Sequence, residues 1–225
     1  MKIATWNIER LQKRKNKEII QSIKQANADI LILTEASDLI DLSDDYAFSS
    51  KTILLHDSIN NYRTDERRVI IYSKFPIIKT VETYDDKTSC CAEIETPFGN
   101  LVVYGTLIGI YGNRRTCFMQ DLDKQIEDIN KISQLGSLCF AGDLNISFAD
   151  NYYFTKAGRE KLNQVFITNN LFNLTKEIPK NIDHIVVSAN LVDKIKHTIK
   201  TWNHAKKLSD HIGVCVELFP QQSLT

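Results

Sequence analysis

One short stretch constrains the fold more than any other, the segment 138–145, which reads LCFAGDLN. An apolar run that ends at a glycine is typical of a strand buried on both faces. The polar residues that follow, Asp143 and Asn145, stand at i and i+2, so in a continuing strand they project to the same side. A carboxylate beside an amide at a sheet edge suits the positioning of water next to a metal ion. The alternative is that Asp143 only caps a turn.

The apolar pattern predicts alternating helices and strands along the whole chain. Strand 3–8, a helix over 15–26 with isoleucines at helical spacing, and strand 29–34 form a β–helix–β start. Short segments separated by turn residues then predict antiparallel hairpins, with strands at 51–56, 68–73, 77–83, 89–96 and 101–107. Helices are predicted at 117–134 and 156–169, and strands at 138–143, 182–188, 197–202 and 212–218.

This order predicts an α/β fold in which two sheets pack face to face with helices outside. The 225 residues show no break in composition, so we expect one domain over 1–220 and a flexible tail over 221–225. Each half of the chain runs from a helix to strands, which leaves a duplication of the two halves open.

The composition limits which cellular compartments and which kinds of binding partner are expected for the protein. Lys plus Arg equal Asp plus Glu, so the formal net charge is zero, unlike domains that hold nucleic acid by bulk electrostatics. The count of five cysteines is odd, and neighbours such as Cys90 and Cys91 cannot easily pair, so free thiols in a reducing compartment are expected. No apolar run resembles a signal peptide or a membrane span, so we expect a cytoplasmic protein. The sequence indicates no protein partner.

Acidic and amide residues recur where the predicted strands end. These residues are Asn7, Glu35, Asp143 with Asn145, Asp183, and Asp210 with His211. If the strands align, the side chains meet at one rim and form a strongly negative pocket that needs a cation. A set of carboxylate and amide oxygens favours Mg²⁺ or Mn²⁺ rather than zinc.

The ordered set of motifs resembles the endonuclease/exonuclease/phosphatase superfamily, which has the deoxyribonuclease-I-like fold. The motifs are TWNI from Thr5, LTE ending at Glu35, GDLN from Gly142, IDHIVVS from Ile182 and SDH from Ser209. The resemblance implies a four-layer sandwich of two mainly antiparallel sheets with helices on both outer faces. It also implies metal-dependent hydrolysis of a phosphoester.

The resemblance assigns an expected metal site to three of these residues. Glu35 is expected to be the main ligand of Mg²⁺ or Mn²⁺, helped by Asn7. Asp210 is expected to lie close to the ion, either directly or through water.

The remaining motif residues are expected to act on water and phosphate. By resemblance, Asp143 orients or deprotonates the attacking water, and Asn145 holds that water or the phosphate. His211 is expected to bind a non-bridging phosphate oxygen. Asp183 is expected to accept a hydrogen bond from His211 and favour its charged form. We assign no role to His184.

The chain departs from the family pattern at Leu107, where many members carry a histidine or tyrosine. An aliphatic residue can neither donate a proton nor bind phosphate, so metal-bound water or another side chain must replace it. Tyr111 and Arg114 are the candidates, and with Asn113 they are expected to contact substrate. A loop with surface arginines is the alternative interpretation of this segment.

Three functions are consistent with these residues. The first is a Mg²⁺- or Mn²⁺-dependent phosphodiesterase that acts on DNA or RNA. The second is a phosphatase or phosphodiesterase for a small or lipid phosphate, such as an inositol phosphate or sphingomyelin, which the neutral charge favours. The third, suggested only by Leu107, is a catalytically silent binding protein. Two basic clusters could contact phosphates. Arg63, Arg67 and Arg68 stand beside Tyr62, where a solvated loop is the alternative interpretation, and Lys206 with Lys207 is better placed because it directly precedes the SDH motif.

Overall fold

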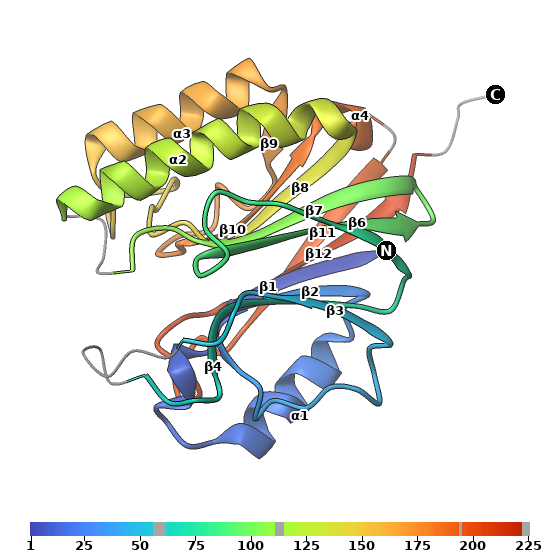
Figure 1. Cartoon of the computed structure of the whole chain (residues 1–225), viewed down its shortest axis with the longest axis vertical. Coiled ribbons are helices and arrows are strands. Elements are labelled where there is room, and N and C mark those ends of the chain that lie inside the picture. The colour runs from blue at the N-terminus through green and yellow to red at the C-terminus, as the bar shows by residue number, and fades with distance from the viewer. Residues whose placement is uncertain (56–61, 111–114, 194, 222–225) are drawn as a thin grey trace.

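The computed structural model describes residues 1–55, 62–110, 115–193 and 195–221, and two β-sheets packed face to face form its centre (Figure 1). The first sheet has six strands in the order β11–β12–β1–β2–β4–β3. Their bounds are β1 (Lys2–Asn7), β2 (Ile30–Ser37), β3 (Phe48–Lys51), β4 (Glu66–Ser73), β11 (Ile195–Trp202) and β12 (Gly213–Pro220). Only β1 and β2 pair in parallel, and the other neighbours in this sheet are antiparallel.

The second sheet repeats this plan with the order β5–β6–β7–β8–β10–β9. Its strands are β5 (Ile77–Val81), β6 (Ser89–Thr96), β7 (Gly99–Leu107), β8 (Ser137–Asp143), β9 (Leu171–Asn173) and β10 (Asp183–Ser188). Here β7 and β8 form the parallel pair, and the remaining pairs are antiparallel. In each sheet a helix connects the two parallel strands, as the geometry of a parallel crossover requires.

Helices cover the outer face of each sheet (Figure 1). Those outer layers are α1 (Asn16–Ala26) on the first sheet, and α2 (Thr116–Ile132) with α3 (Lys156–Thr168) on the second. The short helices are α4 (Ala189–Val192) and the 3₁₀ segments η1 (Glu9–Leu11) and η2 (Ser133–Leu135). No helix in the described ranges is both long and apolar enough to cross a bilayer.

Aliphatic side chains fill the space between the sheets. Ile32, Val69, Ile71 and Val103 are fully buried there, and each contributes about 1.5–3 kcal/mol of apolar burial to folding. The outer faces bury separate clusters, with Ile19 and Ile23 of α1 against β1 and β2, and Phe118 and Leu122 of α2 against β7 and β8. The predicted four-layer sandwich of mainly antiparallel sheets is therefore confirmed.

Several local predictions are wrong. Strand β3 occupies Phe48–Lys51 instead of 51–56, and β9 and α4 were not predicted. The predicted run of hairpins over 51–108 divides between the sheets, because β3 and β4 belong to the first sheet and β5, β6 and β7 to the second. The chain crosses between sheets at Phe75-Pro76, where proline cannot donate to a strand ladder.

Candidate active site

The ends of β1 and β8 bring residues of both sheets together. The Asn7 Nδ2 group donates a hydrogen bond of 3.0 Å to Asp143 Oδ2, and both side chains are buried. Asn7 Oδ1 accepts from the backbone N–H of Glu9 at 2.8 Å, which fixes the orientation of the amide. The site therefore begins at the junction of the two sheets.

The two side-chain oxygens of Asp143 have different partners, one within the turn that follows β8 and the other at the end of β1. Its Oδ1 accepts from the N–H of Asn145 at 2.9 Å, and its Oδ2 accepts from Asn7. Strand β8 ends at Asp143, and Asn145 has a φ of 52°, so strand alternation does not govern how Asn145 projects. The Asn145 Nδ2 group instead donates to the carbonyl of Ile108 at 2.8 Å. The turn interpretation of Asp143 thus describes half of its contacts.

Gly142 permits the close approach of β7 and β8 directly before Asp143. Its φ is +140°, and a Cβ added there would lie 1.9 Å from the carbonyl oxygen of Thr106. Only glycine fits this position without moving backbone.

His211 completes a chain of contacts with two carboxylates. Its Nδ1 lies 2.6 Å from Asp183 Oδ2, and its Nε2 lies 4.0 Å from Asp143 Oδ2. Burial alone would lower the pKa of His211, but the carboxylates of Asp183 and Asp143 raise it to about 10. The imidazole is therefore charged at neutral pH, with Nδ1–H donating to Asp183.

Burial has the opposite effect on Asp143. It raises the pKa of Asp143 to about 7, while the His211 charge opposes the rise and the Asp183 charge adds to it. The group therefore titrates near neutral pH in the absence of a metal ion, chiefly because burial penalises its charged form.

A loop between β11 and β12 carries His211, and hydrogen bonds that are partly or fully buried fix its shape. The Asn203 Nδ2 group donates to the carbonyls of His211 at 2.6 Å and Ser209 at 2.9 Å. Trp6 Nε1 also donates to the His211 carbonyl, at 3.2 Å. Ser209 Oγ donates to the Asn7 carbonyl at 2.6 Å and accepts from the His211 N–H, which ties the loop to β1.

Glu35 lies beside this chain of contacts with an unusual backbone. Its φ is 45°, in the left-handed region that residues other than glycine, asparagine and aspartate rarely adopt. Burial raises the pKa of Glu35, and a hydrogen bond from Asn7 and the charge of His211 act against the rise. The opposing influences show that Glu35, Asn7 and His211 share one neighbourhood. The structure thus places Glu35 and His211 on the same side of the molecule.

The oxygen atoms on this rim fit a hydrated divalent ion. Glu35 is an acid with no ion pair in the described part of the chain, and Asp210 Oδ1 lies 3.7 Å from His211 Nε2. Within residues 1–55, 62–110, 115–193 and 195–221, no three His, Cys, Asp or Glu side chains enclose a metal position. Mg²⁺ usually keeps several waters and takes only one or two carboxylates. Glu35, Asp210 and the Asn7 oxygen therefore suit Mg²⁺ or Mn²⁺ with water completing the shell.

A polar cavity of about 260 Å³ lies beside His211. Tyr152, Lys180 and Lys206 line it together with Asn145 and His211. The Lys206 ammonium lies 5.4 Å from the centroid of the Tyr152 ring. Lys206 thus reaches the site, as its position before the SDH motif suggests, whereas no sequence signal identified Tyr152 or Lys180.

Other sequence candidates lie elsewhere. Tyr111, Asn113 and Arg114 fall outside the described residues, so their expected substrate contacts stay predictions. His184 is fully buried, and its Nε2 lies 3.0 Å from the Ile146 carbonyl, so it packs within the fold.

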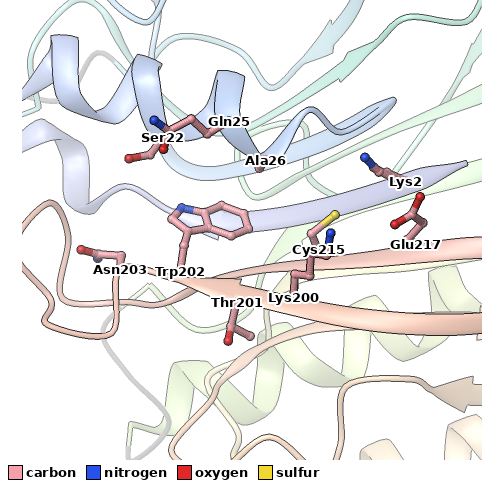
Figure 2. Close-up of a pocket in the computed structure, with 10 residues that line it drawn as sticks. All are labelled: Lys2, Ser22, Gln25, Ala26, Lys200, Thr201, Trp202, Asn203, Cys215 and Glu217. Carbon is pink, nitrogen blue, oxygen red and sulfur yellow. The ribbon is translucent and has the colours of Figure 1, made fainter.

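A further cavity lies between α1 and strands β1, β11 and β12 (Figure 2). It measures about 260 Å³, and Trp202, Asn203 and Cys215 are among the residues that line it. Trp202 packs edge-on against Trp6, with ring centroids 5.6 Å apart. The cavity therefore adjoins the residues that hold the loop but none of the predicted catalytic groups lines it.

Comparison with known families agrees with this geometry. Residues 4–211 match the Endonuclease/Exonuclease/phosphatase family. The chain belongs to this family. Comparison with curated proteins gives no match. Family membership makes the protein a phosphoester hydrolase by class, and the family's general use of divalent metals agrees with the oxygen-rich rim.

Solved structures of other family members share the fold. An endonuclease/exonuclease/phosphatase from Beutenbergia cavernae DSM 12333 superposes with a TM-score of 0.75 at 14% identity, covering 99% of this chain and 72% of that one. An AP endonuclease from Archaeoglobus fulgidus gives 0.71 at 14% identity, covering 97% and 99% of the two chains. A 3'-5' exonuclease from Neisseria meningitidis gives 0.70 at 17% identity, again covering 97% and 99%.

Sequence reasoning missed the residues that support the family motifs. Asn203 and Trp6 hold the His211 carbonyl, yet neither is acidic or basic and both stand next to apolar strand residues. Trp6 lies within the TWNI motif without an expected role of its own, and the one signal for Asn203 was its position between a predicted strand end and the SDH motif.

Proposed function

We propose that this family member is a Mg²⁺- or Mn²⁺-dependent phosphodiesterase that cleaves DNA or RNA by attack of water. The observation that supports it most is the contact chain from Asn7 through Asp143 to His211 and Asp183, with Glu35 beside it. In this proposal the charged His211, the Asp143 carboxylate that would bind water and the oxygen atoms that would hold the metal ion all act around one position.

His211 supplies positive charge for the phosphate. Its Nδ1–H is committed to Asp183, so its Nε2–H is the group that can donate to a non-bridging oxygen. A donor that is charged and held before substrate arrives stabilises the negative charge that grows in the transition state. Asp183 thereby positions His211 and maintains its charge.

Asp143 and Asn145 are proposed to handle the water. Each Asp143 oxygen already accepts one hydrogen bond, and the remaining lone pairs can accept from a water molecule. The Asn145 Nδ2 group donates to the carbonyl of Ile108, and this bond holds the side chain that is proposed to contact the water or the phosphate. A carboxylate with a pKa near neutrality is suited to accept the proton of the water as it attacks.

Glu35, Asp210 and Asn7 would hold the metal ion. The bound ion would polarise the phosphoryl oxygen and stabilise the developing charge. The residues of the chain then serve to fix the ion next to the position that His211 and Asp143 face.

Two features favour a nucleic acid strand as substrate. The Tyr152–Lys206 cavity beside His211 combines an aromatic ring with a cation, which suits a base and its phosphate. Structures with the same fold include an AP endonuclease and a 3'-5' exonuclease.

The zero net charge predicts that binding is local and that few phosphates are neutralised. Tyr111, Asn113 and Arg114 are proposed to contribute further contacts. The free cysteines are consistent with the proposed cytoplasmic location.

The test is hydrolysis of plain duplex, abasic duplex and single-stranded DNA and RNA in Mg²⁺, in Mn²⁺ and in EDTA. We expect metal-dependent cleavage of at least one strand, and its loss in Asp143→Asn. Turnover of inositol phosphates or sphingomyelin without strand cleavage would instead support a small or lipid phosphate as substrate. Absence of all turnover, with intact folding, would reject the proposal.

A further inference from the structure

Arg68 is a buried cation that forms no ion pair with any residue the structure describes. The residue is 8% exposed. Its Nε is sealed from solvent and has no hydrogen-bond partner among the described residues. Its guanidinium carbon lies 5.3 Å from the centroid of the Tyr62 ring. Burying an unpaired guanidinium costs free energy, so the position calls for an anion.

The neighbouring arginines differ from Arg68 because they are neutralised. Arg10 and Arg63 both pair with Glu66, at 2.9 and 2.7 Å, and Arg67 pairs with Asp38 at 2.9 Å. Pairing within the fold thus accounts for the rest of this basic cluster.

Arg68 lines the same cavity as Glu35. This cavity measures about 270 Å³, and Leu107, Ile110 and Tyr62 form other parts of its wall. A water molecule needs only about 10–15 Å³ on such a measure, so a phosphate group has room. Leu107 is the last residue of β7 and has no polar side-chain atom. Another residue of the cavity must therefore bind the phosphate. The cavity therefore presents an acid suited to a metal ion and an arginine suited to an anion.

We propose that Arg68 binds a phosphate group of the substrate on the Glu35 side of the catalytic centre. This inference rests on the proposed phosphodiesterase function and names a substrate-binding residue for it. The planar fork of a guanidinium matches two phosphate oxygens, and partial exclusion of water strengthens the contact. A guanidinium keeps its proton at all ordinary pH values, so Arg68 holds charge and does not act as an acid.

The first experiment measures phosphate binding without catalysis. Inorganic phosphate is titrated in EDTA by calorimetry into the native protein, Arg68→Met and Lys51→Met. Lys51 lies on β3, pairs with Asp38 and is absent from the cavity wall, so it controls for the loss of one charge nearby. We expect Arg68→Met to weaken phosphate binding at least about tenfold and Lys51→Met to leave it within about twofold. Equal affinities in all three proteins would overturn the inference.

A second measurement separates binding from a structural role. Because Arg68 forms no ion pair with the residues that the structure describes, Arg68→Met should melt no lower than the native protein. An arginine needed for folding would instead lower the melting temperature when it is replaced. Should Arg68→Met fold poorly, Arg68→Lys retains the charge but not the fork. It should then bind phosphate more weakly than the native protein, and native affinity in Arg68→Lys would contradict a bidentate contact.

Strand cleavage distinguishes this inference from the proposed function. In one outcome, the native protein cleaves no strand while Arg68→Met binds phosphate more weakly than the native protein does. That result would support the phosphate site and reject a nucleic acid substrate. If the native protein cleaves strands and Arg68→Met retains the full kcat/KM, the result would reject the phosphate site at Arg68 and support the nuclease function.

Discussion

Asn7 donates a hydrogen bond of 3.0 Å to Asp143, and this contact joins the end of a strand in one sheet to the end of a strand in the other. Neither residue reaches the site through a long flexible side chain, so the positions of the strand ends set the geometry. The parallel pairs β1–β2 and β7–β8 stand at the centre of their sheets, where pairing on both sides restricts movement.

Asp143→Asn should abolish most activity without weakening the fold. The amide keeps the shape of the carboxylate but cannot accept the proton of water, so kcat should fall by about 10²- to 10⁴-fold. The melting temperature should change little, because the removal of a buried negative charge offsets the loss of the one hydrogen bond that the new NH₂ group cannot accept. Steady-state cleavage rates and thermal unfolding measure both effects. Asp44→Asn, an exposed acid in a turn, serves as the control and should retain native rates.

The charge of His211 should stabilise the metal-free protein up to alkaline pH. The pKa of His211 is about 10 in the fold, against 6.5 for an unperturbed histidine, so the folded state holds this proton more tightly. The stabilisation is complete below pH 6.5 and is lost as the pH rises toward 10. Melting temperatures in EDTA should therefore fall more steeply across this range in the native protein than in His211→Gln. Parallel curves for the two proteins would contradict a raised pKa.

Asn203→Ala should impair catalysis from outside the site. The change removes two hydrogen bonds that hold the carbonyls of Ser209 and His211, at an expected cost of about 1–3 kcal/mol. The imidazole would lose its fixed position, so kcat should fall more than KM changes. NMR of the His211 ring in metal-free protein would report a changed environment. Asn190→Ala, at an exposed position on α4, is the matched control, and equal losses in both variants would refute the positioning role.

Gly142→Ala should be severely destabilising. The new Cβ would meet the Thr106 carbonyl at 1.9 Å, and the backbone at φ +140° is strained for any other residue. We expect a loss of about 3 kcal/mol or more in denaturant unfolding, because two paired strands must separate. Gly136 also has a positive φ, of +149°, but a Cβ added there would meet no atom within 4 Å. Gly136→Ala therefore measures the cost of backbone strain without a steric clash. A smaller loss in Gly142→Ala than in Gly136→Ala would contradict the steric argument.

Apolar runs that end in polar residues predicted much of this structure. Asp143 and Glu35 stand out because each follows several buried aliphatic residues, where an acid without a function is costly. The same runs predicted most strands and helices, because burial on one or both faces leaves a clear periodicity. The crossing at Phe75-Pro76 could not be predicted, since the strands on both sides of it have similar patterns.

Tertiary contacts decide the remaining features. The left-handed backbone of Glu35 has no local sequence cause, because glutamate does not favour it. Arg68 could not be distinguished from Arg63 and Arg67, since the difference lies in which acids reach each guanidinium. Asn203 acts through backbone carbonyls several residues away, and sequence patterns do not record such bonds.

Dividing the site between two stacked sheets makes the aliphatic layer between them part of the alignment of the reacting groups. A cavity made there, as by Ile71→Ala, would let one sheet slide against the other while each kept its own ladder of backbone bonds. Glu35 would move with one sheet, and Asp143 with the other. Such a protein would lose turnover on warming well before its secondary structure melts.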